Sequence, residues 1–176
     1  MMRRGGSAYT GVDHSAKGLK SDGEIYISGG VIDLSTADDA IHAGVLLTVD
    51  DGELTILSSD DALHSDDLLE INGGRIDITD CFEGIEAFAI EVSGGDVVIR
   101  AVNDGINANG SEFGMMGWGR GSSEAAEVEI TSLSGEATTY YRQTGGTVDL
   151  VVTGNTNNVG DGIDSNGYVY IDGGVL

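Results

Sequence analysis

The sequence contains no proline and only one cysteine, and lysine and arginine together supply just 8 of its 176 residues. The single cysteine, Cys81, excludes an intramolecular disulfide. A chain without proline keeps a backbone N–H at every position, as strands inside a sheet require. No apolar run approaches the ~18 residues of a membrane-spanning helix, and no apolar segment of a signal peptide follows the basic residues 1–4. These absences favour a strand-rich domain without disulfides.

Positive charge is scarce, because 30 acidic residues face those 8 basic ones and give a net charge of −22. Small soluble domains usually carry a net charge of magnitude about 2–8. A surface this acidic repels nucleic acid and anionic membranes. Two explanations remain open at this point: a solvated acidic surface, or acids that are gathered at cation sites.

The sequence repeats itself with a period of about 22 residues. Asp38–Ala43 (DDAIHA) returns as Asp60–Ser65 (DDALHS), 22 residues later, and the offset falls to 21 only between the copies at Phe82–Ala87 and Asn103–Ala108. Weaker copies of the same unit stand at Ala16–Ser21, Phe82–Ala87, Asn103–Ala108 and Gly160–Ser165. A unit of this length cannot bury its own apolar face, so the copies must stack.

Each repeat reads as three short strands with strict alternation of apolar and polar residues. Ile25 and Ile27 are expected to point inward, as are Ile32 and Leu34 after a glycine pair that marks a corner. Such coils leave no room for helices between strands. The sequence therefore predicts an all-β fold, a right-handed parallel β-helix with about 22 residues and three short strands per coil.

The repeat also suggests how the chain is divided. Residues 1–15 match it poorly and are predicted to form a partial coil or cap, followed by the β-helix over residues 16–176. A glycine-rich stretch at about 109–127 interrupts the period and is predicted to be a loop insertion. The last coil is incomplete, and an open β-helix end favours pairing with a second copy of the chain.

Stacking places like-numbered acids in columns about 4.8 Å apart. Such carboxylates repel one another unless positive charge lies between them. Oxygen ligands at this spacing suit calcium, so we predict a calcium site, with solvated corner acids as the alternative. The predicted ligands are Asp38, Asp39, Asp60, Asp61, Glu83, Asp104, Asp161 and Asp164.

Histidines and aromatic residues are candidate contacts to a ligand. His42 and His64 fall in one outward column and resemble a transition-metal pair, but a third nitrogen or thiolate ligand is missing, so we interpret them as a surface ladder. Rings can stack on sugars. Tyr26 and Tyr170 share a column several coils apart, so they do not form one platform, and Trp118 lies in the predicted loop.

The units AKGLKSDGEIYISGGVIDLSTADDAIHA (16–43) and GDGIDSNGYVYIDGGVL (160–176) resemble a known family. They are similar to bacterial carbohydrate-binding β-helix domains, formerly a domain of unknown function, whose fold resembles that of the family 9 polysaccharide lyases, which act on pectate. The resemblance spans residues ~16–108 and ~140–176. It implies an extracellular or cell-surface protein, bound calcium, and affinity for acidic plant polysaccharide or cellulose. Lys17, in the acidic column, departs from the pattern because it would repel a cation.

Three functions follow from these observations. The first is a non-catalytic, calcium-containing module that binds pectate-like polysaccharide or cellulose. The second is a calcium-dependent lyase, whose β-elimination needs a basic side chain near the metal, and only Lys17 or Lys20 qualifies. The third is a structural or adhesive solenoid. The scarcity of bases favours binding over catalysis.

Overall fold

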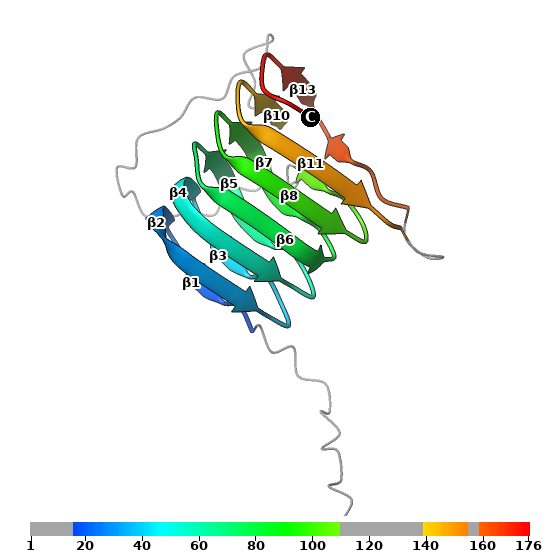
Figure 1. The fold of residues 1–176 in the computed structure, drawn as a ribbon. Helices are drawn as coiled ribbons and strands as arrows, with labels where there is room; N and C mark the ends of the chain where they lie inside the picture. The colour runs from blue at the N-terminus through cyan, green and yellow to red at the C-terminus, as the bar shows by residue number, and fades with distance from the viewer. Residues whose placement is uncertain (1–15, 110–138, 155–158) are drawn as a thin grey trace, which may run out of the picture.

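The fold is a parallel β-solenoid, as a computed structural model describes it for residues 16–109, 139–154 and 159–176. All elements among these residues are strands, and no helix long and apolar enough to cross a membrane occurs among them. The successive coils stack into an elongated body (Figure 1). The predicted cap at 1–15 and the predicted loop, apart from Asn109, lie outside the described residues.

Three stacks of parallel strands make up the walls of the solenoid. The first stack is formed by β1 (Leu19–Ser21), β3 (Ile41–Ala43), the first part of β5 (Leu63–Ile71), the first part of β7 (Ile85–Val92), β9 (Ile106–Ala108) and β12 (Ile163–Ser165). The second stack is formed by the first parts of β2 (Glu24–Ser35) and β4 (Leu46–Leu57), the later parts of β5 and β7, β10 (Tyr140–Gln143) and β13 (Tyr168–Ile171). The third stack is formed by the later parts of β2 and β4, β6 (Arg75–Cys81), β8 (Asp96–Ala101) and β11 (Thr147–Val152).

The predicted register is confirmed, because residues one period apart pair across neighbouring strands. Ile41 pairs with Leu63, and His42 pairs with His64. The inward positions form one continuous core of mostly aliphatic side chains, in which Leu47, Leu69 and Ile90 are fully buried in a single column. Leu19 is an exception at 37% exposure, because β1 is the first described strand and, among the described strands, pairs only with β3.

The strands are longer than the predicted three short ones per coil. In β2 and β4 the second and third segments are continuous, and the register shifts at the corner between Ile27 and Val31. In β5 and β7 the first and second segments are continuous. Pairing continues through the corner from β2 to β4 and from β5 to β7, so in these two strand pairs the corner is a bulge rather than a break.

One of these bulges changes the course of β5. Ser65 pairs with Ala87 and Leu68 with Ala89, so that Asp66 and Asp67 together oppose a single residue of β7. The offset between paired residues is therefore 22 up to Ser65 and 21 from Leu68 onward, which matches the change of repeat length in the sequence. A bulge re-aims the side chains of the strand that carries it, and this one lies beside the candidate site.

Candidate functional site

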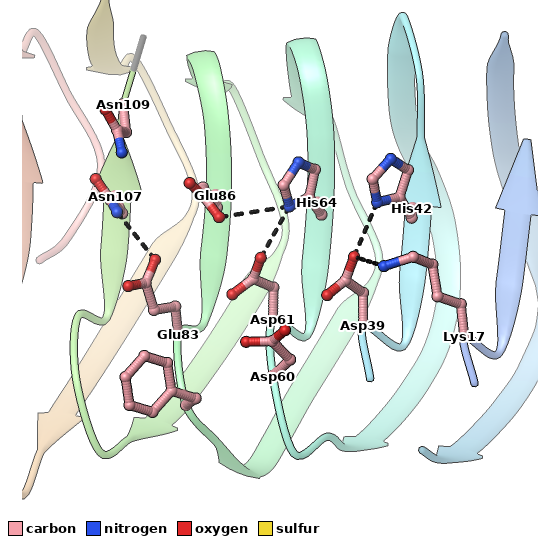
Figure 2. A pocket seen from close by; sticks show the side chains of 11 residues that line it. Lys17, Asp39, His42, Asp60, Asp61, His64, Glu83, Glu86, Asn107 and Asn109 are labelled. Atoms are coloured by element: carbon pink, nitrogen blue, oxygen red, sulfur yellow. Dashed lines mark hydrogen bonds and ion pairs between the residues drawn. The ribbon is translucent and has the colours of Figure 1, made fainter. Parts of the chain in front are cut away.

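A pocket of about 380 Å³ lies along the first stack of strands and the corners that precede it (Figure 2). Because equivalent positions of successive coils face the same way, each coil contributes side chains to it. Its lining residues are Lys17, Asp39, His42, Asp60, Asp61, His64, Phe82, Glu83, Glu86, Asn107 and Asn109. The pocket therefore gathers predicted calcium ligands, both column histidines and one of the two lysines considered as bases.

Lys17 closes one end of the pocket through ion pairs with two acids of the next coil. Its Nζ lies 3.1 Å from Asp38 Oδ1 and also contacts Asp39 Oδ2. Burial lowers the pKa of Lys17, but the hydrogen bonds and charges of the two aspartates outweigh it, and the net shift is upward. Lys17 is therefore held as a cation.

The two histidines form a stacked pair in the middle of the pocket. Their ring centroids are 4.4 Å apart and their planes differ by 8°. Each Nδ1 is 2.8 Å from a buried aspartate three residues earlier, Asp39 for His42 and Asp61 for His64. The repeat D-x-x-H thus places the same carboxylate–imidazole pair on adjacent rungs.

The Nδ1 atom of His64 has a second acidic partner besides Asp61, because it also lies 3.4 Å from Glu86 Oε2. Burial lowers the pKa of His64, but the hydrogen bonds to Asp61 and Glu86 outweigh it and raise the pKa to about 10. The hydrogen bond to His64 lowers the pKa of Glu86, whereas burial raises that of Asp61 to about 8. The cluster therefore holds an imidazolium against two carboxyl groups.

Asp66 joins this cluster although the sequence did not mark it as a site residue. Its Oδ1 lies 3.3 Å from His42 Nε2 and 3.4 Å from His64 Nε2. The bulge in β5 accounts for this placement. The one signal in the sequence was the change of offset from 22 to 21.

At the other end of the pocket, amide side chains contact the acids. Asn103 and Asn107 donate to the two oxygens of Glu83 at 2.8 and 2.9 Å, and burial raises the pKa of Glu83. Asn103 also donates to Asp104, at 3.0 Å, and the backbone N–H of Asp161 donates to Asp104 at 2.7 Å.

The predicted corner column is continuous. Backbone hydrogen bonds join the corners at Asp39, Asp61, Glu83, Asp104 and Asp161 from one coil to the next. Donors of the chain itself contact Asp39, Asp61, Glu83 and Asp104, so their repulsion is already reduced without a bound ion. Asp164 lies on β12 beside Asn107 of β9, in the column of the two histidines rather than in the corner column.

Asp38, Asp39 and Asp60 form a cluster of carboxylates at the corner next to Lys17. They bring one oxygen each to within 4.8 Å of one another. Burial raises the pKa of Asp60, and the charges of Asp39 and Asp38 raise it further. Carboxylate oxygens are of the ligand type that calcium prefers, although a full calcium shell takes 6–8 oxygens.

The predicted sugar-binding aromatics do not share this pocket. Tyr26 is on β2, where its hydroxyl donates to Glu24 at 2.9 Å, and Tyr170 is on β13 at the other end of the solenoid (Figure 1). Tyr170 instead contacts Tyr140 and Tyr168, with ring centroids 6.4 and 5.8 Å away. Trp118 lies outside the described residues.

This three-tyrosine patch could not be located from the sequence alone. Tyr140 and Tyr168 pair directly in β10 and β13. The stretch of sequence between β9 and β10 interrupts the repeat, so the sequence does not give the offset that aligns Tyr140 with Tyr168. The register of the solenoid is what brings the rings together.

Comparison with known proteins supplies a family. The model of a family described as carbohydrate-binding domain-containing protein matches residues 2–62 and 59–176. Neither the curated proteins nor the solved structures gave a match. The predicted resemblance to carbohydrate-binding β-helix domains is supported, whereas the likeness to pectate lyases stays a prediction. The chain belongs to the family of carbohydrate-binding domain-containing proteins.

Proposed function

We propose that this chain is a non-catalytic module that binds an acidic polysaccharide, with polygalacturonate as the representative ligand, in a calcium-dependent manner. The family match supports a carbohydrate ligand. The observation that carries the finer proposal is the cluster of Asp38, Asp39 and Asp60 oxygens beside the pocket. A polysaccharide ligand also supports the predicted extracellular or cell-surface location.

In this proposal calcium is needed to overcome the electrostatic repulsion between the acidic polysaccharide and the acidic chain. A polyanionic glycan is repelled by a chain of net charge −22. Asp38, Asp39 and Asp60 would hold the ion in place of the Lys17 ammonium that pairs with two of them, and when bound it supplies positive charge for uronate carboxylates. Lys17 and the imidazolium of His64 add positive charge in the same pocket.

The lysines argue against the lyase alternative. A general base needs a pKa near the working pH, but the ion pairs to Asp38 and Asp39 raise the pKa of Lys17. Lys20 has a side chain 54% exposed, lies 3.5 Å from Asp22, and does not line the pocket. Lys17 lies in the pocket but its raised pKa keeps it protonated, and Lys20 does not line the pocket, so neither lysine suits the role of a base.

Calcium removal tests the proposal. We expect EDTA to abolish retention of the chain on polygalacturonate, and Asp60→Asn to weaken calcium-supported binding at least about tenfold, because one carboxylate ligand is lost. Isothermal titration with soluble oligogalacturonate measures the affinity. Asp33→Asn is the matched control, because this exposed acid lies on the third stack, away from the cluster.

Two outcomes would contradict this proposal. Retention that EDTA does not change would remove the role of calcium. Unsaturated product formed from polygalacturonate with calcium at alkaline pH, and lost in Lys17→Ala, would establish the lyase instead.

A second ligand, neutral cellulose, is favoured by the three-tyrosine patch. Tyr168 and Tyr170 are 39% and 41% exposed, and adjacent rings on one face suit stacking on flat glucose units. We expect the double variant Tyr168→Ala/Tyr170→Ala to reduce retention on insoluble cellulose by about 3- to 10-fold, with no effect of EDTA. Tyr26→Ala is the control, because Tyr26 lies on β2 at the other end of the same column. Equal retention of both variants would exclude the patch as a cellulose site.

A further inference from the structure

His42 and His64 direct their outer nitrogens at the same atom. The Nε2 atoms lie 3.3 and 3.4 Å from Oδ1 of Asp66. The rings are parallel and stacked, so both imidazoles face the same side of the sheet. Two imidazoles and one carboxylate form a donor set found in catalytic zinc sites and in two-histidine, one-carboxylate iron sites.

The inner nitrogens are held by carboxylates that fix the ring orientations. Asp39 and Asp61 are 3% and 6% exposed, and each lies 2.8 Å from the Nδ1 of its histidine. An Nδ1–H that donates to a carboxylate leaves the Nε2 lone pair for a metal and makes it a better ligand. Metal-binding histidines in proteins usually have this outer contact, and here both histidines have it.

Asp66 can complete such a site because of where it lies. It sits in the bulge of β5 with its side chain 47% exposed, so it can approach an ion without disturbing the core. Zinc–ligand distances are about 2.0–2.2 Å, so two ligand atoms of a tetrahedral ion lie roughly 3.4 Å apart, as Asp66 Oδ1 and each histidine Nε2 already do. The exposed side leaves room for water as a fourth ligand.

The local charge also suits a divalent ion. Asp39, Asp61, Asp66 and Glu86 all contact the histidine pair. These four side chains are close enough to offset the charge of a divalent ion bound at the Nε2 atoms. Imidazole nitrogens favour zinc, cobalt and nickel over calcium, which prefers oxygen.

We propose that His42, His64 and Asp66 form a transition-metal site for zinc or a chemically similar divalent ion, distinct from the cluster of Asp38, Asp39 and Asp60. This inference goes beyond the proposed function and does not depend on it. The two sites use different ligand atoms, although Asp39 contributes to both, once as a ligand and once as the partner of His42.

Cobalt and zinc titrations test the site while excess calcium occupies oxygen-only sites. We expect one Co²⁺ per chain with visible absorption of a nitrogen-ligated ion, displaced by Zn²⁺. His42→Gln should weaken zinc binding about 100-fold and Asp66→Asn about tenfold, by loss of a ligand. Asp33→Asn should leave it unchanged. Circular dichroism checks that each variant is folded.

Three results would overturn the proposal. The first is no cobalt or zinc binding in the presence of calcium. The second is unchanged affinity in both His42→Gln and Asp66→Asn. The third is zinc affinity that falls in Asp60→Asn but not in His42→Gln, which would place the ion on the acidic cluster. Calcium affinity measured on Asp66→Asn is expected to be unchanged, so failure of this site and failure of the calcium site are separable.

Discussion

Replacing Gly94 by alanine is expected to lower the free energy of unfolding by about 3 kcal/mol or more. A Cβ at this position would lie 2.2 Å from the carbonyl oxygen of Asn72 and 3.1 Å from its carbonyl carbon. That carbonyl belongs to the backbone of the preceding coil, which cannot shift alone. Ser93 N–H and Gly94 N–H both donate to Ile71 O, at 2.8 and 3.3 Å, and tie the two corners together.

Gly23→Ala is the matched control for this prediction. The nearest atom to a Cβ at Gly23 is Ser21 Oγ, at 3.8 Å, which is ordinary contact. We expect Gly23→Ala to change the stability by less than about 1 kcal/mol. Urea unfolding followed by circular dichroism measures both variants. If Gly94→Ala unfolds at the same urea concentration as Gly23→Ala, the coils are not stacked as closely as the structure has them.

The register of the solenoid could be predicted from the sequence, because a repeat of one coil carries its pairing partner in the next copy. The match of DDAIHA to DDALHS is enough to pair Ile41 with Leu63 and to place His42 beside His64. The alternation of apolar residues then fixes the inward side. The close approach at Gly94 follows from the same stacking.

Details that depend on a single inserted residue were harder to predict. The offset of 21 in the sequence shows that one coil is one residue shorter than the coil before it. It does not show at which residues the longer coil forms a bulge. The structure places the bulge at Asp66 and Asp67, and this brings Asp66 to the histidines. In the proposed metal site the third ligand is therefore the carboxylate of Asp66, two residues after His64 in β5, and not a nitrogen or thiolate.

The sequence also could not predict which groups neutralise the acidic column. Stacked carboxylates predict repulsion and a need for positive charge, and a bound cation was one answer. Which donors of the chain reach which acid depends on rotamers and burial. The structure assigns Lys17 and His42 to Asp39, and Asn103 and Asn107 to Glu83. In the cluster of Asp38, Asp39 and Asp60, Lys17 already pairs with two of the three acids, so an added cation there has to displace its ammonium group.

The stability of the metal-free protein is expected to fall as the pH rises, most steeply between about 6.5 and 8. The pKa of His64 is about 10 in the folded chain against 6.5 ordinarily, so its stabilising effect is complete below pH 6.5 and lost by pH 10. The pKa of Asp61 is about 8 against 3.8, so its effect is lost between those values. Both groups hold extra protons in the folded state between pH 6.5 and 8. The lowered pKa of Glu86 acts the other way, but only near and below its ordinary value of 4.5.

His64→Gln tests this account, because it removes the imidazolium and leaves Asp61 and Glu86 as neighbouring acids in a buried cluster. We expect it to destabilise the folded chain by about 3 kcal/mol near neutral pH, and to abolish the loss of stability between pH 8 and 10. Urea unfolding in EDTA, at pH values from about 5 to 10, measures both effects, and Asp33→Asn is the control for charge alone. A pH profile of His64→Gln parallel to that of the unmodified chain above pH 8 would show that His64 is not held as a cation. Since cobalt and zinc binding is measured separately on Asp66→Asn, that result would correct the electrostatics of the cluster without deciding the metal site.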